Sequence, residues 1–420
     1  MMKIRFFRLF FTAVAIAAAF SVNSLATDYG RYQVNAHPYA HGDLSDTKAP
    51  AGYKPFYISY MGRHGSRYLT GDEHPKEVLK VLKKAEEKGI LSQSGREVMS
   101  IMDTMLRINN KNYGYLSPTG HAELDLIGCR MTSRFSPVFR NKDRQVVNAF
   151  SNVVPRCINT MADVCCAIQR NCPSVRVNLN TNENVRYSVI SNKSSEDSKI
   201  YHKSKDKAID SLEFILPYPQ DLMNTLFTDP EAAKEICKPV SFAKHLFYCA
   251  AYSEVMGLPK DLVFNYFSDK DLYSYFVLKN SDVYISYGPA KEGLGRILNG
   301  VHCILDGVLK DADAALEGND HCADMRFGHD SGTIPYAALL GIEGVSKEAS
   351  VLNLDHGWNS SVHMCMACNV QIVFYKNSGN DVLVKVLFNE AESRIDGLEP
   401  VYGPYYKWDD FKKHMQSKLN

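Results

Sequence analysis

Three short apolar segments, each followed by a loop and then by a helical pattern, constrain the fold of this chain most strongly. The first covers residues 55–61 and runs into Gly62, the second covers residues 145–150, and the third covers residues 323–327 and ends at Gly328. Short apolar runs bounded by turn residues are typical of buried strands in a parallel sheet. Because strands that alternate with helices build such a sheet, the sequence predicts an α/β fold with a mostly parallel central sheet flanked by helices.

Helical patterns follow each of the three predicted strands. Residues 77–88 place apolar side chains at helical spacing, Pro155 is positioned to open a second helix, and residues 334–340 form a third. Late in the chain, residues 369–375 and 382–388 flank an Asn-Ser-Gly-Asn turn. This last pattern predicts a β-hairpin.

The middle of the chain has a different pattern from its two ends. Polar stretches there lead into apolar helical segments such as residues 243–256 and 293–309. A chain of 420 residues also exceeds the roughly 250–300 residues that one core usually holds. We therefore predict an α/β core formed by residues 27–174 and 301–420, with a smaller, mainly helical cap domain inserted over residues 175–300.

The amino-terminal segment has the pattern of a signal peptide. Three basic residues precede an apolar run over residues 9–20, and the small residues Ser-Leu-Ala follow at positions 24–26. The apolar run is shorter than the roughly 20 residues that a membrane-spanning helix needs. The pattern predicts cleavage after residue 26, export to the periplasm or the medium, and no stable membrane span in the mature chain.

The charge balance argues against a nucleic-acid-binding protein. Removal of residues 1–26 would leave 45 basic against 47 acidic residues, a formal net charge of −2. Nucleic-acid-binding domains normally carry a basic excess. We therefore expect no nucleic-acid partner, and the sequence leaves the oligomeric state open.

The cysteines indicate neither a definite disulfide framework nor a metal site. The chain has 11 cysteines, an odd number, and their pairing cannot be read from their spacing. Cys365 and Cys368 form a Cys-x-x-Cys pair beside His363, but a structural zinc site needs four ligands and usually two such pairs. The interpretation we favour for these two cysteines is buried thiols or a disulfide, and we expect no metal.

Polar residues gather where the three predicted strands end. Arg-His-Gly-Ser-Arg follows the first strand at residues 63–67, Arg156 lies just beyond the second, and His329 and Asp330 follow the third. In such sheets the carboxyl ends of the strands meet at one edge and carry the functional residues. Guanidinium groups and a helix amino terminus are suited to binding a phosphate group. The three strand ends therefore predict a phosphate-binding site.

The same residues predict a reaction. A neutral histidine among phosphate-binding arginines can attack phosphorus, which makes His64 the candidate nucleophile. His329 would stabilise charge on the transferring group, and Asp330 would protonate the leaving alkoxide and then activate water. Arginine and histidine supply the positive charge in this scheme, so it needs no metal or other cofactor.

Each motif alone also has an ordinary structural interpretation. Arg-His-Gly recurs by chance, a His-Asp pair is more often a surface hydrogen bond, and Arg156 alone fits a solvated helix residue. Their order along the chain, each at the end of a predicted strand, favours the catalytic interpretation.

The motifs resemble those of the histidine acid phosphatases. RHGSRYLT is similar to that family's Arg-His-Gly-x-Arg-x-Pro signature, SNVVPRCINTMADV to its third-arginine segment, and FGHDSGTIPYAALLG to its His-Asp donor segment. Leu-Ser-Pro-Thr-Gly at residues 116–120 matches the family's Leu-Thr-Pro-x-Gly element. Within the family, the Arg-Tyr pair at residues 67–68 and the tail VLVKVLFNEAE look most like multiple inositol polyphosphate phosphatases. The resemblance implies phytate and lower inositol phosphates as substrates. It implies these site residues: His64 as nucleophile, Asp330 as acid, and Arg63, Arg67, Arg156 and His329 as phosphate ligands.

The sequence departs from the family pattern at two places. Leu69 stands where the signature has proline, which removes no chemical group. The inositol polyphosphate branch carries His-Ala-Glu as its donor motif, whereas His329 is followed directly by Asp330. A His-Ala-Glu does occur at residues 121–123, too early in the chain for the donor segment, and we interpret it as the polar start of a helix.

A basic cluster over residues 192–207 is a candidate determinant of substrate choice. Acidic residues are interleaved with the basic ones, so a solvated mixed-charge loop is at least an equal interpretation. The basic members are Lys193, Lys199, His202, Lys203, Lys205 and Lys207, and the acidic ones are Glu196, Asp197 and Asp206.

The function that the sequence predicts is a phosphomonoester hydrolase that forms a phosphohistidine and acts on inositol polyphosphates. The expected partner is therefore a small-molecule phosphomonoester substrate. A broad acid phosphatase of the same mechanism is the nearest alternative. A mutase-like phosphotransferase fits less well, because of the His-Asp donor and the export signal. A phosphate-ester-binding protein without turnover is a further alternative from another class.

Overall fold

A computed structural model of the chain describes residues 29–181, 189, 196–216, 218–354 and 356–419. The predicted signal peptide, residues 1–26, lies outside the described residues. Of the predicted basic cluster, Lys193 also lies outside them.

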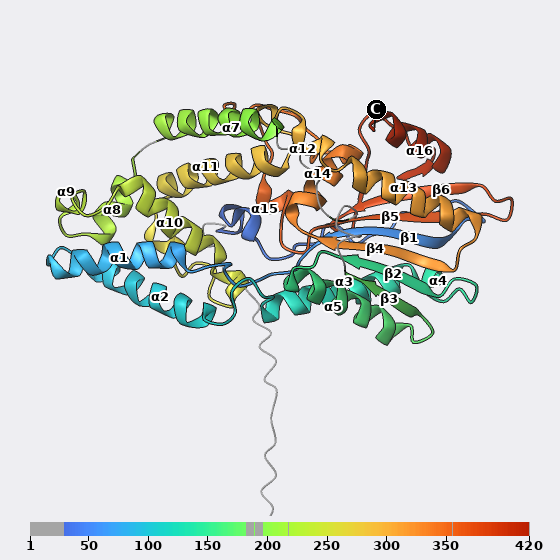
Figure 1. Cartoon of the computed structure of the whole chain (residues 1–420), viewed down its shortest axis with the longest axis horizontal. Coiled ribbons are helices and arrows are strands. Elements are labelled where there is room, and N and C mark those ends of the chain that lie inside the picture. Colours follow the sequence, from blue (N-terminus) through green and yellow to red (C-terminus); the bar gives the residue numbers. More distant parts are fainter. Residues whose placement is uncertain (1–28, 182–188, 190–195, 217, 355, 420) are drawn as a thin grey trace, which may run out of the picture.

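The centre of the protein is an eight-stranded sheet with the order β3-β2-β4-β1-β5-β6-β7, in which β8 pairs with β6 (Figure 1). The strands are β1 Lys54–Arg63, β2 Val146–Ser151, β3 Arg176–Asn180, β4 His321–Gly328, β5 Asn369–Lys376, β6 Val382–Phe388, β7 Ala391–Ser393 and β8 Tyr405–Lys407. The pairs β3-β2, β2-β4 and β4-β1 are parallel, and the later pairs are antiparallel. The α/β class is confirmed, with a mixed sheet whose core strands are parallel.

The antiparallel half of the sheet comes from the predicted hairpin. β5 and β6 pair antiparallel from Val370 opposite Phe388 to Lys376 opposite Val382, as the predicted hairpin requires. β5 also pairs antiparallel with β1. The hairpin thus gives β1 a neighbour on its second side, which places β1 inside the sheet and protects it from an exposed edge.

Alternation along β1 sends its side chains to two different cores. Ile58 and Tyr60 pack in one cluster of buried residues, whereas Tyr57 and Met61 pack in the other. Successive strand residues point to opposite faces of a sheet, so a strand that is apolar throughout needs cover on both faces. The aromatic run at residues 55–61 meets that condition.

Helices cover both faces of the sheet. Figure 1 shows α3, α4 and α5 on one face and α13, α14 and α16 on the other. The helices are α1 Glu73–Glu87, α2 Gln93–Asn109, α3 Pro118–Arg134, α4 Ser136–Phe139, α5 Pro155–Asn171, α7 Glu196–Ile215, α8 Gln220–Leu226, α9 Pro230–Ala233, α10 Pro239–Tyr252, α11 Asp269–Tyr287, α12 Arg296–Asn299, α13 His302–Glu317, α14 Asp330–Leu340, α15 Ser360–His363 and α16 Trp408–Ser417.

A helical part lies at one end of the molecule, where α7, α8, α10 and α11 gather (Figure 1). Helices α1 and α2 also lie there, and α1 packs against α10. Two details differ from the predicted limits of the cap. β3 still belongs to the central sheet although it begins at Arg176, and α1 and α2 come from the first core segment. We use the word cap below for this helical end of the molecule.

The single helix predicted over residues 293–309 is wrong. The structure has the short helix α12 and then α13, which begins at His302. Leu294 and Gly295 precede α12 with φ values of +57° and +67°, a left-handed conformation that no α-helix contains. Among the described helices, none has the length and apolar character needed to cross a membrane.

Candidate active site

The ends of the three parallel strands meet at one edge of the sheet. Arg63 at the end of β1 lies opposite Gly328 at the end of β4, and Ser151 at the end of β2 lies opposite Phe327. The backbone nitrogen of His64 donates to the carbonyl of Gly328 at 3.0 Å, which extends the pairing by one residue. The predicted nucleophile and the predicted donor segment are therefore side by side.

His64 is held in one tautomer. Its Nδ1 lies 2.9 Å from the carbonyl oxygen of Gly65, and a carbonyl can only accept, so Nδ1 carries the hydrogen and Nε2 keeps a lone pair. Burial lowers the pKa of His64 well below its ordinary value, and the charges of Arg63, Arg67 and Arg156 lower it further. The imidazole is therefore neutral and can act as a nucleophile even in acidic solution.

Three arginines surround His64 and keep donor nitrogens unused. The Nε atoms of Arg63, Arg67 and Arg156 are buried and make no hydrogen bond to any of the described residues. Arg63 is 0% exposed, and its Nη1 is fixed by carbonyl oxygens, among them that of Met364 at 2.6 Å. Buried donors without acceptors are unfavourable, so these nitrogens form a cradle suited to an anion.

His329 and Asp330 complete the cradle at the amino end of α14. The rings of His64 and His329 have their centroids 5.5 Å apart at an interplanar angle of 77°. Burial, followed by the charge of Arg156, lowers the pKa of His329 to about 4. A neutral His329 can accept a proton or donate a hydrogen bond as the charge in the cradle changes.

Asp330 lies against Arg63. Its Oδ2 is 3.0 Å from the Nη2 of Arg63. Burial alone would raise the pKa of Asp330, but Arg63 and then His329 outweigh burial and keep the pKa below its ordinary value. The lowered pKa favours the carboxylate form of Asp330 beside Arg63. An anion that binds Arg63 would weaken this ion pair and raise the pKa of Asp330.

Glycines allow the nucleophile loop to approach the start of α3. A Cβ on Gly65 would lie 2.9 Å from the carbonyl oxygen of Gly120, and one on Gly120 would lie 2.1 Å from the carbonyl oxygen of Ser66. The backbone nitrogen of Ser117 donates to the same Ser66 oxygen at 2.9 Å. The Leu-Ser-Pro-Thr-Gly element therefore supports the loop that carries His64.

Glu123 has a larger role than the sequence indicated. The His-Ala-Glu of residues 121–123 lies in the first turns of α3, as predicted, but Glu123 is only 8% exposed. Its carboxylate accepts hydrogen bonds from the backbone nitrogen and the hydroxyl of Ser66, at 2.8 and 2.7 Å, and from the backbone nitrogen of Tyr39 at 2.8 Å. Glu123 thus fastens the nucleophile loop to α3.

Replacement of Glu123 by alanine is expected to destabilise the protein by about 3 kcal/mol, because three buried donors lose their acceptor. The free energy of unfolding in urea measures this loss. Exposed His121 pairs with Asp163, and His121→Ala serves as the control, with an expected change within about 0.5 kcal/mol. Equal unfolding free energies for Glu123→Ala and the wild type would contradict the assigned role.

The cap reaches the cradle through Tyr252, which the sequence did not single out. The Nη2 of Arg67 donates to the Tyr252 hydroxyl at 2.9 Å, and the Arg67 guanidinium lies 5.1 Å from the centre of the Tyr252 ring. Tyr252 also lines a cavity of about 360 Å³ between α10, α11 and the segment around Asn35. The backbone oxygen of Asn35 in turn accepts from Arg63 at 2.8 Å.

Most described members of the basic cluster are exposed to solvent. Lys199, His202, Lys203 and Lys207 are exposed on α7. Lys205 turns toward α11 and pairs with Asp282 at 2.5 Å. The mixed-charge interpretation therefore fits the described part of this cluster better than a substrate site.

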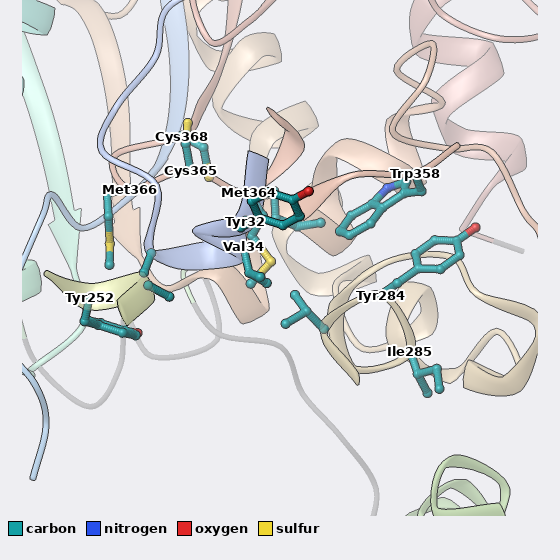
Figure 2. Packing of buried hydrophobic residues seen from close by; sticks show 14 of the residues in the cluster. Tyr32, Val34, Tyr252, Tyr284, Ile285, Trp358, Met364, Cys365, Met366 and Cys368 are labelled. Atoms are coloured by element: carbon teal, nitrogen blue, oxygen red, sulfur yellow. The ribbon is translucent and has the colours of Figure 1, made fainter. Parts of the chain in front are cut away.

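Cys365 and Cys368 are buried thiols that form no disulfide with each other. Figure 2 shows both inside the packed apolar cluster. Burial raises the pKa of Cys365 to about 11, so this sulfur stays a neutral thiol. Leu69, which replaces the expected proline, is 1% exposed and packs in the same cluster.

The fold is that of known phosphatase structures. The chain superposes on the multiple inositol polyphosphate phosphatase of Bifidobacterium longum in complex with phosphate, with a TM-score of 0.79 and 19% identity, over 93% of this chain and 98% of that one. The phytase of D. castellii matches with a TM-score of 0.66 and 16% identity, over 96% and 88% of the two chains. Hafnia alvei phytase matches with a TM-score of 0.55 and 14% identity, over 89% and 98%.

No family model and no curated protein matches the chain by sequence. The structural match across most of the chain confirms the resemblance that the motifs indicated, and at these identities it establishes the fold.

Proposed function

We propose that this protein is a phosphomonoester hydrolase of the histidine acid phosphatase type, with inositol polyphosphates as its substrates. The observation that carries the proposal is the set of unpartnered buried nitrogens of Arg63, Arg67 and Arg156 around the neutral imidazole of His64. Three guanidinium groups can bind the non-bridging oxygens of a phosphate while Nε2 of His64 faces phosphorus.

The first step transfers the phosphoryl group to the protein. Nε2 of His64 attacks phosphorus, the bond from phosphorus to the ester oxygen breaks, and Asp330 gives its proton to the departing alkoxide. Asp330 takes up that proton from the solvent when the substrate binds, because a phosphate dianion on Arg63 raises the pKa of Asp330 and favours its protonation. The alcohol then leaves and the phosphohistidine remains.

The second step restores the protein. Asp330, now a carboxylate, takes a proton from water, and the resulting hydroxide attacks phosphorus. The bond between phosphorus and Nε2 breaks, which releases inorganic phosphate and neutral His64. Arg63, Arg67, Arg156 and His329 hold the three equatorial oxygens through both steps, where charge develops.

Support for inositol polyphosphates comes from the solved structures with this fold. The Bifidobacterium longum phosphatase was determined with inositol hexasulfate, whose six sulfates stand in for phosphates, and Hafnia alvei phytase with the same kind of ligand. One observation favours the alternative of a broad acid phosphatase. In the cavity beside the cradle, Lys244 pairs with Glu213 and Lys279 with Asp282, so its lysines are already neutralised.

Phosphate release from phytate and from an aryl phosphate, measured side by side, tests the proposal. Stepwise loss of phosphates from phytate, with the higher kcat/KM, is the expected result. Phosphate release from the aryl phosphate alone would support phosphatase activity but contradict the proposed specificity for inositol polyphosphates. If the protein bound both substrates but released phosphate from neither, the proposal that it is an enzyme would be contradicted.

We also propose that residues 1–26 are a signal peptide and that the protein acts in the periplasm or outside the cell. Support comes from the basic and apolar pattern of this segment alone. Amino-terminal sequencing of the protein from the producing cells is expected to begin at Thr27. Protein that stays in the cytoplasm with residues 1–26 still attached would contradict the proposed signal peptide.

A further inference from the structure

Tyr252 brings a hydroxyl group from the cap to the edge of the cradle. It is the last residue of α10 and is 3% exposed. Figure 2 shows it in the buried cluster that also contains Tyr32 and Val34. The packing fixes the ring, so the hydroxyl that contacts Arg67 has little freedom to turn away.

The hydrogen bond from Arg67 leaves Tyr252 a hydrogen of its own to donate. The Tyr252 oxygen accepts from Nη2 of Arg67 at 2.9 Å, and the rings of Tyr252 and Tyr248 stack with their centroids 4.6 Å apart. A phenol oxygen that accepts a hydrogen bond still carries one hydrogen that it can donate.

The charges around this hydroxyl favour donation to an anion. Burial alone would raise the pKa of Tyr252, but Arg67 and then Arg63 outweigh burial and hold the pKa below its ordinary value. The same two arginines belong to the cradle. A phosphate oxygen that binds the fork of Arg67 would therefore lie next to the phenol, within the reach of one hydrogen bond.

We propose that the Tyr252 hydroxyl donates a hydrogen bond to the phosphoryl group of the substrate, so that the cap supplies a phosphate ligand in addition to the cradle. This inference rests on the proposed function, because the proposed function assigns a phosphoryl group to the cradle. It makes the cap part of the binding site: helix α10 must pack correctly for the phosphate to be fully held.

The alternative is that Tyr252 acts only by positioning Arg67, and a double-mutant cycle separates the two. Tyr252→Phe is made in the wild type and in Arg67→Ala, and inorganic phosphate binding to each protein is measured by calorimetry. Phenylalanine keeps the ring and its packing. We expect a loss of about tenfold in phosphate affinity in both backgrounds, since a direct contact does not depend on Arg67.

Tyr275→Phe is the matched control, because Tyr275 is another buried cap tyrosine that lines the same cavity without contacting the cradle. Its phosphate affinity is expected to change less than about twofold, and thermal unfolding verifies that each variant is folded. Direct contact would be contradicted if Tyr252→Phe lowered phosphate affinity tenfold in the wild type but not in Arg67→Ala. It would also be contradicted if Tyr252→Phe lowered phosphate affinity in neither background. These binding measurements need no turnover. The role of Tyr252 can therefore be tested even if the phosphate-release assay contradicts the proposed hydrolase activity.

Discussion

Replacement of His64 by alanine is expected to lower kcat by about 10⁴-fold or more while the protein stays folded, because the proposed first step then has no nucleophile. Alanine removes the imidazole and its bond to the carbonyl of Gly65, but the backbone bonds of His64 to Gly328 and Ala367 remain. The surrounding β1–β4 pairing does not depend on the side chain. We therefore expect only a small change in the unfolding midpoint.

The measurement combines turnover with trapping of the intermediate. Wild-type protein mixed with a ³²P-labelled substrate and denatured in alkali is expected to retain label, since phosphohistidine survives base, and His64→Ala is expected to retain none. His121→Ala is the control, because His121 is an exposed histidine outside the cradle. Near-full activity of His64→Ala, or labelling of that variant, would show that another group attacks phosphorus.

Asp330→Asn is expected to produce the second-largest effect, and the effect should depend on the leaving group. An alkoxide needs a proton as it departs, so hydrolysis of an alkyl phosphate should fall by about 10²–10⁴-fold. A nitrophenolate leaves without a proton, so the first step with nitrophenyl phosphate should fall much less. Asparagine is similar in size to aspartate and remains beside Arg63, so the substitution removes the acidic group without changing the packing.

Phosphate binding provides an independent measurement on the same variant. The carboxylate of Asp330 occupies Nη2 of Arg63 and repels an incoming anion, so its neutral replacement should bind inorganic phosphate at least as tightly as the wild type does. Rates of the first step with the two esters come from single-turnover experiments. An equal loss for both esters would contradict the role of Asp330 as the acid.

The strands and the cradle residues were predictable from the sequence for local reasons. Each strand that carries the site is a short apolar run ended by glycine or by a polar residue, and this pattern arises because both faces of the strand are buried. Parallel strands share one carboxyl edge, so the sequence alone predicts that Arg63, His64, Arg156, His329 and Asp330 lie together.

Several contacts depend on segments far apart in the chain, and only the tertiary structure decides them. Tyr252 meets Arg67 across 185 residues, and Glu123 meets Ser66 across 57. Nothing in the local pattern distinguishes these two side chains from other helix residues. The same holds for Lys205, whose orientation toward Asp282 results from the packing of α7 on α11.

The order of the core elements, the edge at which the site lies and the chemical groups available there all follow from the local sequence pattern. The tertiary structure decided which groups are buried, which nitrogens remain without an acceptor, and how the cap meets the cradle. The physical reason is that backbone pattern and turn chemistry act between near neighbours in the chain. Burial and charge pairing, which set the pKa of His64 and Asp330, arise only when distant segments exclude water together.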